Sequence, residues 1–120
     1  VVGFSNASRL LMGAEIIDAE TAHSMGLVSS VHPDEKLLEE AVSLATRLSV
    51  AAPVSIAASK KLLWKGLSLS WDEMHQMEGP VFEWVGRQPD SVEGINAFLE
   101  KRPANWTMNP YQDLPKELFD

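Results

Sequence analysis

Apolar residues recur at helical spacing through most of this chain, and no other feature limits its fold as strongly. The clearest run covers residues 35–50, with an apolar stripe made of Leu37, Leu38, Ala41, Leu44, Ala45 and Leu48. The same spacing predicts helices over residues 54–67, from Trp71 onwards, and over a last segment that ends near Lys101. Only residues 27–31, Leu-Val-Ser-Ser-Val, are typical of a strand. We therefore expect a mainly α fold with at most one short strand.

Capping residues predict where several of these helices begin and end. Asp18 is placed to cap a short helix that Gly26 ends, and Gly13 ends the helix before it. Ser70 and Glu73 have the spacing of a capping box, in which each side chain bonds the backbone N–H of the other residue. No helical spacing follows residue 103, so residues 104–120 are expected to be an extended arm that is ordered only if it docks.

Composition excludes several classes of function. Apolar residues make up 45% of the chain, which predicts a globular protein, and the formal net charge of −7 disfavours binding to nucleic acid or to an anionic membrane. The chain has no Cys, and His23, His32 and His75 lack ligand spacing, so no metal site is expected. No apolar run reaches the length of a membrane span. With no visible targeting signal, we expect a cytoplasmic protein, or a mitochondrial matrix or peroxisomal one in a eukaryote.

Three polar residues are candidates for acid–base chemistry. Glu78 falls on the expected inner face of the helix that starts at Trp71, a face formed by Trp71, Met74, Val81, Phe82 and Val85. A carboxylate there could act as an acid with a raised pKa, but a partly buried Glu paired with a cation or a backbone donor is the commoner case. His23 and His75 could act as bases, yet neither has an orienting partner nearby in sequence. Packing or surface roles are therefore favoured.

The four Trp residues could form a ligand cage, but helical spacing favours other roles. Trp71 and Trp84 lie on or near the inner stripe of one predicted helix, where core packing is expected. Trp64 and Trp106 are candidates for contact with a neighbouring subunit.

Phe98 and Lys101 form a candidate binding site at the end of the last predicted helix. They are three residues apart and share one flank, which Gly94 leaves open, while Glu93 is placed to complement the N-terminal dipole. An aromatic ring beside a cation suits a ligand with a flat base and phosphates. The alternative is a docking Phe and a Lys that stabilises the helix dipole, and the pattern alone favours this alternative.

Several segments together resemble a known family. "GINAFLEKRPAN" is similar to the C-terminal signature of the crotonase family, the enoyl-CoA hydratases and isomerases. Upstream, "SRLLMGAEIIDAETAHSMGLVSSVHPDEKLLEEAVSLATRLS", "APVSIAASKKLL" and "MEGPVFEWVGRQPDSVEGINAFLEKR" resemble successive segments of the same family. Their order and spacing cover almost the whole chain. The chain also starts without Met, which is expected of a piece of a longer protein.

The resemblance implies the C-terminal helical, or trimerisation, region of a crotonase-like α/β fold. Residues 1–34 would join it to the N-terminal core, residues 35–103 would form a helical domain for oligomerisation and for covering CoA, and residues 104–120 the arm. It also implies a homo-oligomer, a trimer or a hexamer. Trp106 stands where the family commonly has Phe, and the arm continues beyond the usual end, where it could wrap a neighbouring subunit.

The resemblance further implies an enzyme that adds water to a 2-enoyl-CoA, with coenzyme A as part of the substrate and no separate cofactor. The family's oxyanion amides and catalytic acids correspond to positions before Val1, so no catalytic residue is assigned here. Phe98 and Lys101 correspond to residues that reach CoA bound in the next subunit, and Arg102 would contribute more weakly. The alternatives are a non-catalytic helical oligomerisation module and an isomerase or another member of the family.

Overall fold

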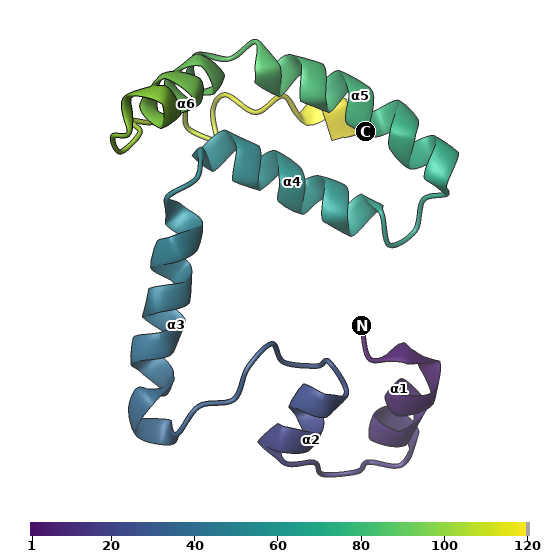
Figure 1. Ribbon diagram of the computed structural model, residues 1–120. Helices are drawn as coiled ribbons and strands as arrows, with labels where there is room; N and C mark the ends of the chain where they lie inside the picture. Colours follow the sequence, from purple (N-terminus) through teal and green to yellow (C-terminus); the bar gives the residue numbers. More distant parts are fainter. Residues whose placement is uncertain (120) are drawn as a thin grey trace. The chain divides into compact units, whose positions relative to one another are not determined.

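Helices form most of the computed structural model, which describes residues 1–119. In chain order they are α1 (Gly3–Met12), α2 (Ala19–Ser24), α3 (Asp34–Ser49), α4 (Pro53–Lys65), α5 (Trp71–Gly86), α6 (Pro89–Glu100) and the short 3₁₀ helix η1 (Lys116–Phe119) (Figure 1). The part of the chain that the structure describes contains no strand, so the mainly α fold is confirmed.

The strand predicted over residues 27–31 is wrong. These residues form bends and irregular backbone after α2, and the Leu27 N–H donates to the Ala22 carbonyl at 2.9 Å. An extended segment needs a partner strand for its backbone groups, and residues 1–119 offer none. The β-branched composition of the segment therefore does not decide its conformation.

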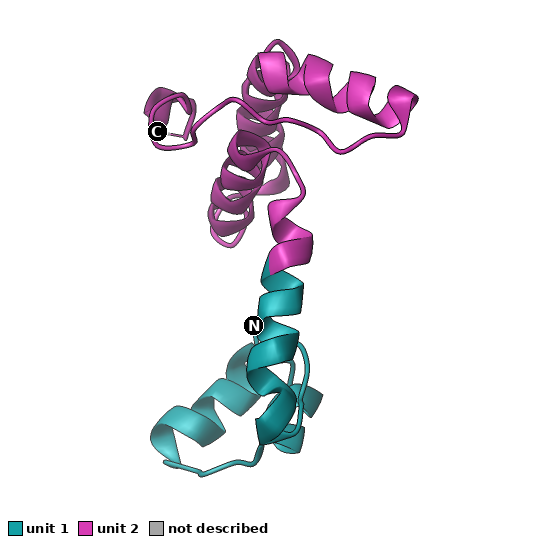
Figure 2. Ribbon diagram, turned by 90° about the vertical axis from the view of Figure 1, so that its left-hand side faces the viewer, with its two compact units in different colours: residues 1–45 teal, residues 46–120 magenta. Residues whose placement is uncertain are grey.

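The chain divides into two compact units, Val1–Ala45 and Thr46–Asp120, with the boundary inside α3 (Figure 2). In the first unit the predicted helix ends are confirmed. The Asp18 side chain accepts a 2.8 Å bond from the Thr21 N–H, α1 ends at Gly13, and Gly26 has the left-handed φ of 75° that glycine tolerates. The three-part division predicted from the sequence remains a prediction.

The second unit has a small apolar core built from two helices and the C-terminal segment. Val54 and Ala58 of α4 pack with Val81 of α5, and with Leu114 and Phe119 from the arm. The C-terminal segment, yellow in Figure 1, therefore docks on its own unit.

Only part of the inner face predicted for α5 is buried. Val81 is 2% exposed, whereas Trp71 and Phe82 are 77% and 78% exposed, so their predicted core positions are wrong. The predicted capping box is confirmed, because the Glu73 carboxylate accepts from the Ser70 N–H at 2.7 Å and Ser70 caps the Glu73 N–H. The local cap thus determines where α5 begins, while only the side chains of α5 that meet α4 and η1 are buried.

Many large apolar side chains stay exposed. On α3 these include Leu37, Leu38, Leu44 and Leu48 from the predicted stripe, and α6 exposes Ile95, Phe98 and Leu99.

Among residues 1–119 no single helix is long and apolar enough to cross a membrane, and one bent pair, α3 with α4, reaches that length and composition only when its members are combined.

Candidate functional site

The candidate site formed by Phe98 and Lys101, called the corner below, lies at the C-terminal end of α6, which closes in a Schellman motif. The Arg102 N–H donates to the Ala97 carbonyl at 3.1 Å, and the Lys101 N–H donates to the Phe98 carbonyl at 3.3 Å. Lys101 itself has a φ of 54°, the left-handed region in which a side chain costs about 1–2 kcal/mol. A lysine therefore occupies a position where glycine would make the helix end more stable.

Phe98 and Lys101 are both exposed. Phe98 is 82% exposed and edges a shallow apolar hollow whose lining includes Ile95, Leu99 and Trp106. Lys101 does not line this hollow, but it follows Phe98 at the same end of the helix. The two side chains are therefore available to a ligand or partner that approaches the end of α6.

Trp106 fills the flank beside Gly94 that was predicted to be open. A Cβ added to Gly94 would lie 3.3 Å from Cη2 of the indole, so glycine permits this close approach. The indole Nε1 donates to the Val50 carbonyl at 2.9 Å, which fixes the ring against Gly94 of α6. Trp106 is thus held within its own unit, and the contact with a neighbouring subunit considered for it is not needed to explain it.

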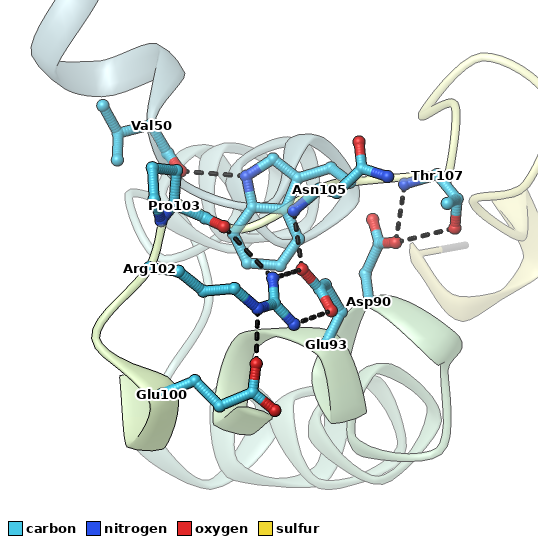
Figure 3. Close-up of polar contacts among 9 residues, drawn as sticks. Val50, Asp90, Glu93, Glu100, Arg102, Pro103, Asn105 and Thr107 are labelled. Carbon is cyan, nitrogen blue, oxygen red and sulfur yellow. Dashed lines mark hydrogen bonds and ion pairs between the residues drawn. The ribbon is translucent and has the colours of Figure 1, made fainter. Parts of the chain in front are cut away.

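A carboxylate–guanidinium network fastens the chain just after the corner (Figure 3). The Arg102 guanidinium donates to both Glu93 carboxylate oxygens, at 2.6 and 3.0 Å, and to Glu100 at 2.6 Å. The Asn105 N–H donates to Glu93 at 2.7 Å. Glu93 lies beyond the first turn of α6, so its predicted dipole role is wrong. Arg102 is engaged inside its own chain, whereas Lys101, the other cation at this corner, forms no ion pair with the residues that the structure describes.

Asp90 anchors the next part of the arm, a role that the sequence did not reveal. This carboxylate is 4% exposed and accepts bonds from the Thr107 N–H at 2.9 Å and the Thr107 hydroxyl at 3.0 Å (Figure 3). It also accepts a bond from the Met108 N–H at 3.3 Å. A buried carboxylate needs such donors, because it would otherwise be charged and unbonded. The partners lie 17 and 18 residues away, so no local motif signals them.

The network lowers the pKa of Glu93 to about 2, chiefly through the Arg102 side-chain bond and next through the Asn105 N–H. In return, Glu93 and then Glu100 raise the pKa of Arg102. The pKa values of Asp18 and Glu73 are also lowered, by the hydrogen bonds of their helix caps. These carboxylates are held in the charged form and bonded to their own chain, which suits anchoring and not proton donation.

We expect acid to destabilise the protein partly through Glu93. Because its folded pKa lies below the ordinary value of 4.5, its contribution is present in full above about pH 4.5 and is lost as the pH falls towards about 2. Glu93→Gln should flatten the fall in the free energy of unfolding over this range, as measured by denaturant titration at several pH values. Glu100→Gln, which removes a single bond to Arg102, is the control. The same pH profile in Glu93→Gln and the parent protein would contradict this assignment.

Glu78 does not have the environment expected of it. It is exposed on α5, beside a hollow that includes Ser59 and Leu62 of α4. Among residues 1–119 it forms no ion pair, so the predicted partly buried pair is wrong. The residues described also contain no group of three or more acidic or His side chains able to hold a metal ion.

The histidines and the remaining tryptophans have packing or surface positions. His75 stacks on Trp71 with ring centroids 5.3 Å apart, and His23 is exposed at the end of α2. Trp84 packs against the core as predicted, and Trp64 is 67% exposed on α4. None of these residues joins Phe98 and Lys101.

Comparisons with known proteins agree over most of the chain. The family model described as enoyl-CoA hydratase/isomerase matches residues 1–109. A putative enoyl-CoA hydratase of Thermus thermophilus is 35% identical over 105 residues, which are 88% of this chain and 42% of that protein. The 2,3-dehydroadipyl-CoA hydratase of Escherichia coli is also 35% identical, over 88% of this chain and 41% of its own length.

A solved structure agrees as well. The crystal structure of an enoyl-CoA hydratase from Bacillus anthracis matches with a TM-score of 0.83 at 30% identity, covering 88% of this chain and 41% of that one. The chain thus spans about two fifths of the length of the relatives it matches.

Proposed function

Since the chain belongs to the enoyl-CoA hydratase/isomerase family, we propose that it forms the C-terminal helical part of an enzyme that processes acyl-CoA thioesters. The observation that carries this proposal is the family match over residues 1–109. Hydration of a 2-enoyl-CoA is the reaction we favour, because the relatives described above are named as hydratases. An isomerase is the alternative within the family.

Within that enzyme, Phe98 and Lys101 contact the coenzyme A moiety of a substrate bound in an adjoining subunit. Both side chains are exposed at the end of α6, where a second subunit can reach them. The Lys101 ammonium would bind a phosphate as a point charge, and the Phe98 ring would pack on the adenine or pantetheine. Glu93, Arg102 and Asp90 act as positioning residues, because they fasten the chain that follows this corner to α6.

The chemical step of the proposed hydration needs donors that stabilise the thioester enolate and a carboxylate that moves the proton. We assign neither to this chain. Asp18, Glu73, Glu93 and Asp90 are all hydrogen-bonded within the fold. Their role in the proposal is structural, and coenzyme A enters as part of the substrate.

The 120-residue chain alone is therefore expected to leave crotonyl-CoA unchanged, whereas a protein that carries the chain in an intact enzyme should hydrate it. Positioned donors and bases account for most of the rate of such reactions, which is the reason for this expectation. The measurement is the loss of enoyl-thioester absorbance over time. Hydration by the chain alone would show that the catalytic groups are wrongly placed. An intact protein that neither hydrates nor isomerises enoyl-CoA would favour the non-catalytic oligomerisation module instead.

We also expect the chain to self-associate, as a trimer or a hexamer in the intact protein. Trp71 and Phe82 of α5, and Phe98 and Leu99 of α6, are each at least 70% exposed, and such apolar surface is typical of an interface. Sedimentation at micromolar concentration should show a species larger than the monomer. A strictly monomeric species would count against this prediction.

A further inference from the structure

Four lysines surround one hollow on the second unit. It lies where α4 meets the C-terminal segment, and its lining includes Lys60, Lys61, Lys65, Lys116, Trp64 and Phe119. These are four of the 10 Lys and Arg residues in a chain with 17 Asp and Glu, and among the described residues 1–119 no carboxylate lines the hollow. The charge of the described lining residues is therefore opposite to the net charge of the chain.

The four lysines are not neutralised by the described part of the chain. The ion pairs found among residues 1–119 involve Arg9, Arg87 and Arg102, and no lysine. Lys61 and Lys65 are four residues apart on α4, a spacing at which like charges repel and destabilise a helix. An anion in the hollow would relieve this repulsion.

Two aromatic rings line the same hollow and differ in their availability. Phe119 is 3% exposed, and its ring already has the Lys61 Nζ 5.2 Å from its centroid. Trp64 is 67% exposed and offers its ring to a flat group. The hollow thus combines cations for phosphate groups with one free ring for a base.

The hollow is distinct from the proposed CoA-contacting corner. It shares no lining residue with the hollow that Phe98 edges. It is also completed by Lys116 and Phe119, which lie beyond the residues 1–109 that the family model matches. The family match therefore covers the α4 side of the hollow but not the side that Lys116 and Phe119 form.

We propose that this hollow binds an adenine nucleotide, with the lysines holding the phosphates and Trp64 stacking on the base. Two sources have this chemistry: a free nucleotide such as ATP, and the nucleotide end of coenzyme A. The proposal goes beyond the function proposed above, because it does not use Phe98 or Lys101.

Calorimetric titration of the chain with ATP, coenzyme A and inorganic tripolyphosphate tests the proposal. ATP should bind saturably, and more weakly at high salt because salt screens exposed charges. The double variant Lys60→Gln/Lys65→Gln should raise the dissociation constant for ATP about tenfold or more, since two phosphate contacts are removed. Trp64→Leu should weaken ATP binding by about fivefold or more and leave tripolyphosphate binding unchanged. Lys36→Gln, on α3 and outside the hollow, is the matched control, and thermal unfolding shows whether each variant keeps its fold.

The coenzyme A titration distinguishes the two sources. Loss of coenzyme A binding in the double variant, with binding retained in the Lys36→Gln control, would assign the hollow to the nucleotide end of coenzyme A. ATP binding that depends on the hollow, without such an effect on coenzyme A, would assign it to free nucleotides. No saturable ATP binding, equal binding by the parent and the double variant, or a Trp64→Leu effect equal for ATP and tripolyphosphate would overturn the proposal. Any of these three results leaves the assignment of Phe98 and Lys101 untouched.

Discussion

Lys101→Gly is expected to raise KM for an acyl-CoA about tenfold in an active protein that carries this chain, with a smaller effect on kcat. The substitution removes a cation that we place on a phosphate far from the reacting thioester. Such a contact is equally strong in the substrate complex and in the transition state, so its loss weakens binding and not the chemical step.

The same substitution should make the protein more stable. Lys101 has a φ of 54°, and glycine adopts this left-handed conformation without the cost that a side chain imposes. We expect the free energy of unfolding to rise by about 1 kcal/mol. Weaker binding in a more stable protein separates a lost contact from a damaged fold.

Lys101→Arg is the control, because it keeps the charge and should leave KM within about threefold of the parent value. Phe98→Ala should also raise KM, without the gain in stability. An unchanged KM in Lys101→Gly would remove Lys101 from the substrate site. Equal effects of Lys101→Gly and Lys101→Arg on KM would show that the contact does not depend on the charge of the side chain.

Phe119→Ala should lower the free energy of unfolding of the second unit by about 3 kcal/mol or more. Phe119 is 3% exposed and packs with Val54, Val81 and Leu114, so its loss leaves a cavity between α4, α5 and the arm. It would also remove the ring beneath the Lys61 ammonium. Denaturant unfolding followed by Trp fluorescence measures this change.

Tyr111→Ala is the matched control for Phe119→Ala. Tyr111 lies in the same arm but is 95% exposed, so its removal should change the free energy of unfolding by less than about 0.5 kcal/mol. If both variants were equally stable, the arm would not be part of the core. A large loss in Phe119→Ala alone would show that residues beyond the family match complete the fold of this unit.

Local chemistry was readable from the sequence where partners are a few residues apart. The Asp18 cap, the Ser70–Glu73 capping box and the Gly13 helix end all involve groups within one or two helical turns, and each is present in the structure. The family was also readable, because its motifs occur in order along the chain. The conformation of residues 27–31 was wrongly predicted to be a strand, because a strand depends on a partner that local sequence does not supply.

In the candidate site, too, the sequence predicted the local features but not the contacts between distant residues. Helical spacing alone placed Phe98 and Lys101 at one end of α6. It could not show that Trp106 packs on Gly94 or that Asp90 holds Thr107, because these partners are 12 and 17 residues apart and their meeting depends on how the chain turns after α6.

The sequence by itself determined the helices, most of their ends and the family. Hydrogen bonds and side-chain spacing within a few residues are sufficient for that. Only the tertiary structure decided which apolar faces are covered: Val81 is buried while Phe82, its neighbour, is exposed. Burial depends on what packs against a helix, and here that is α4 and an arm whose anchoring residues carry no periodic signal.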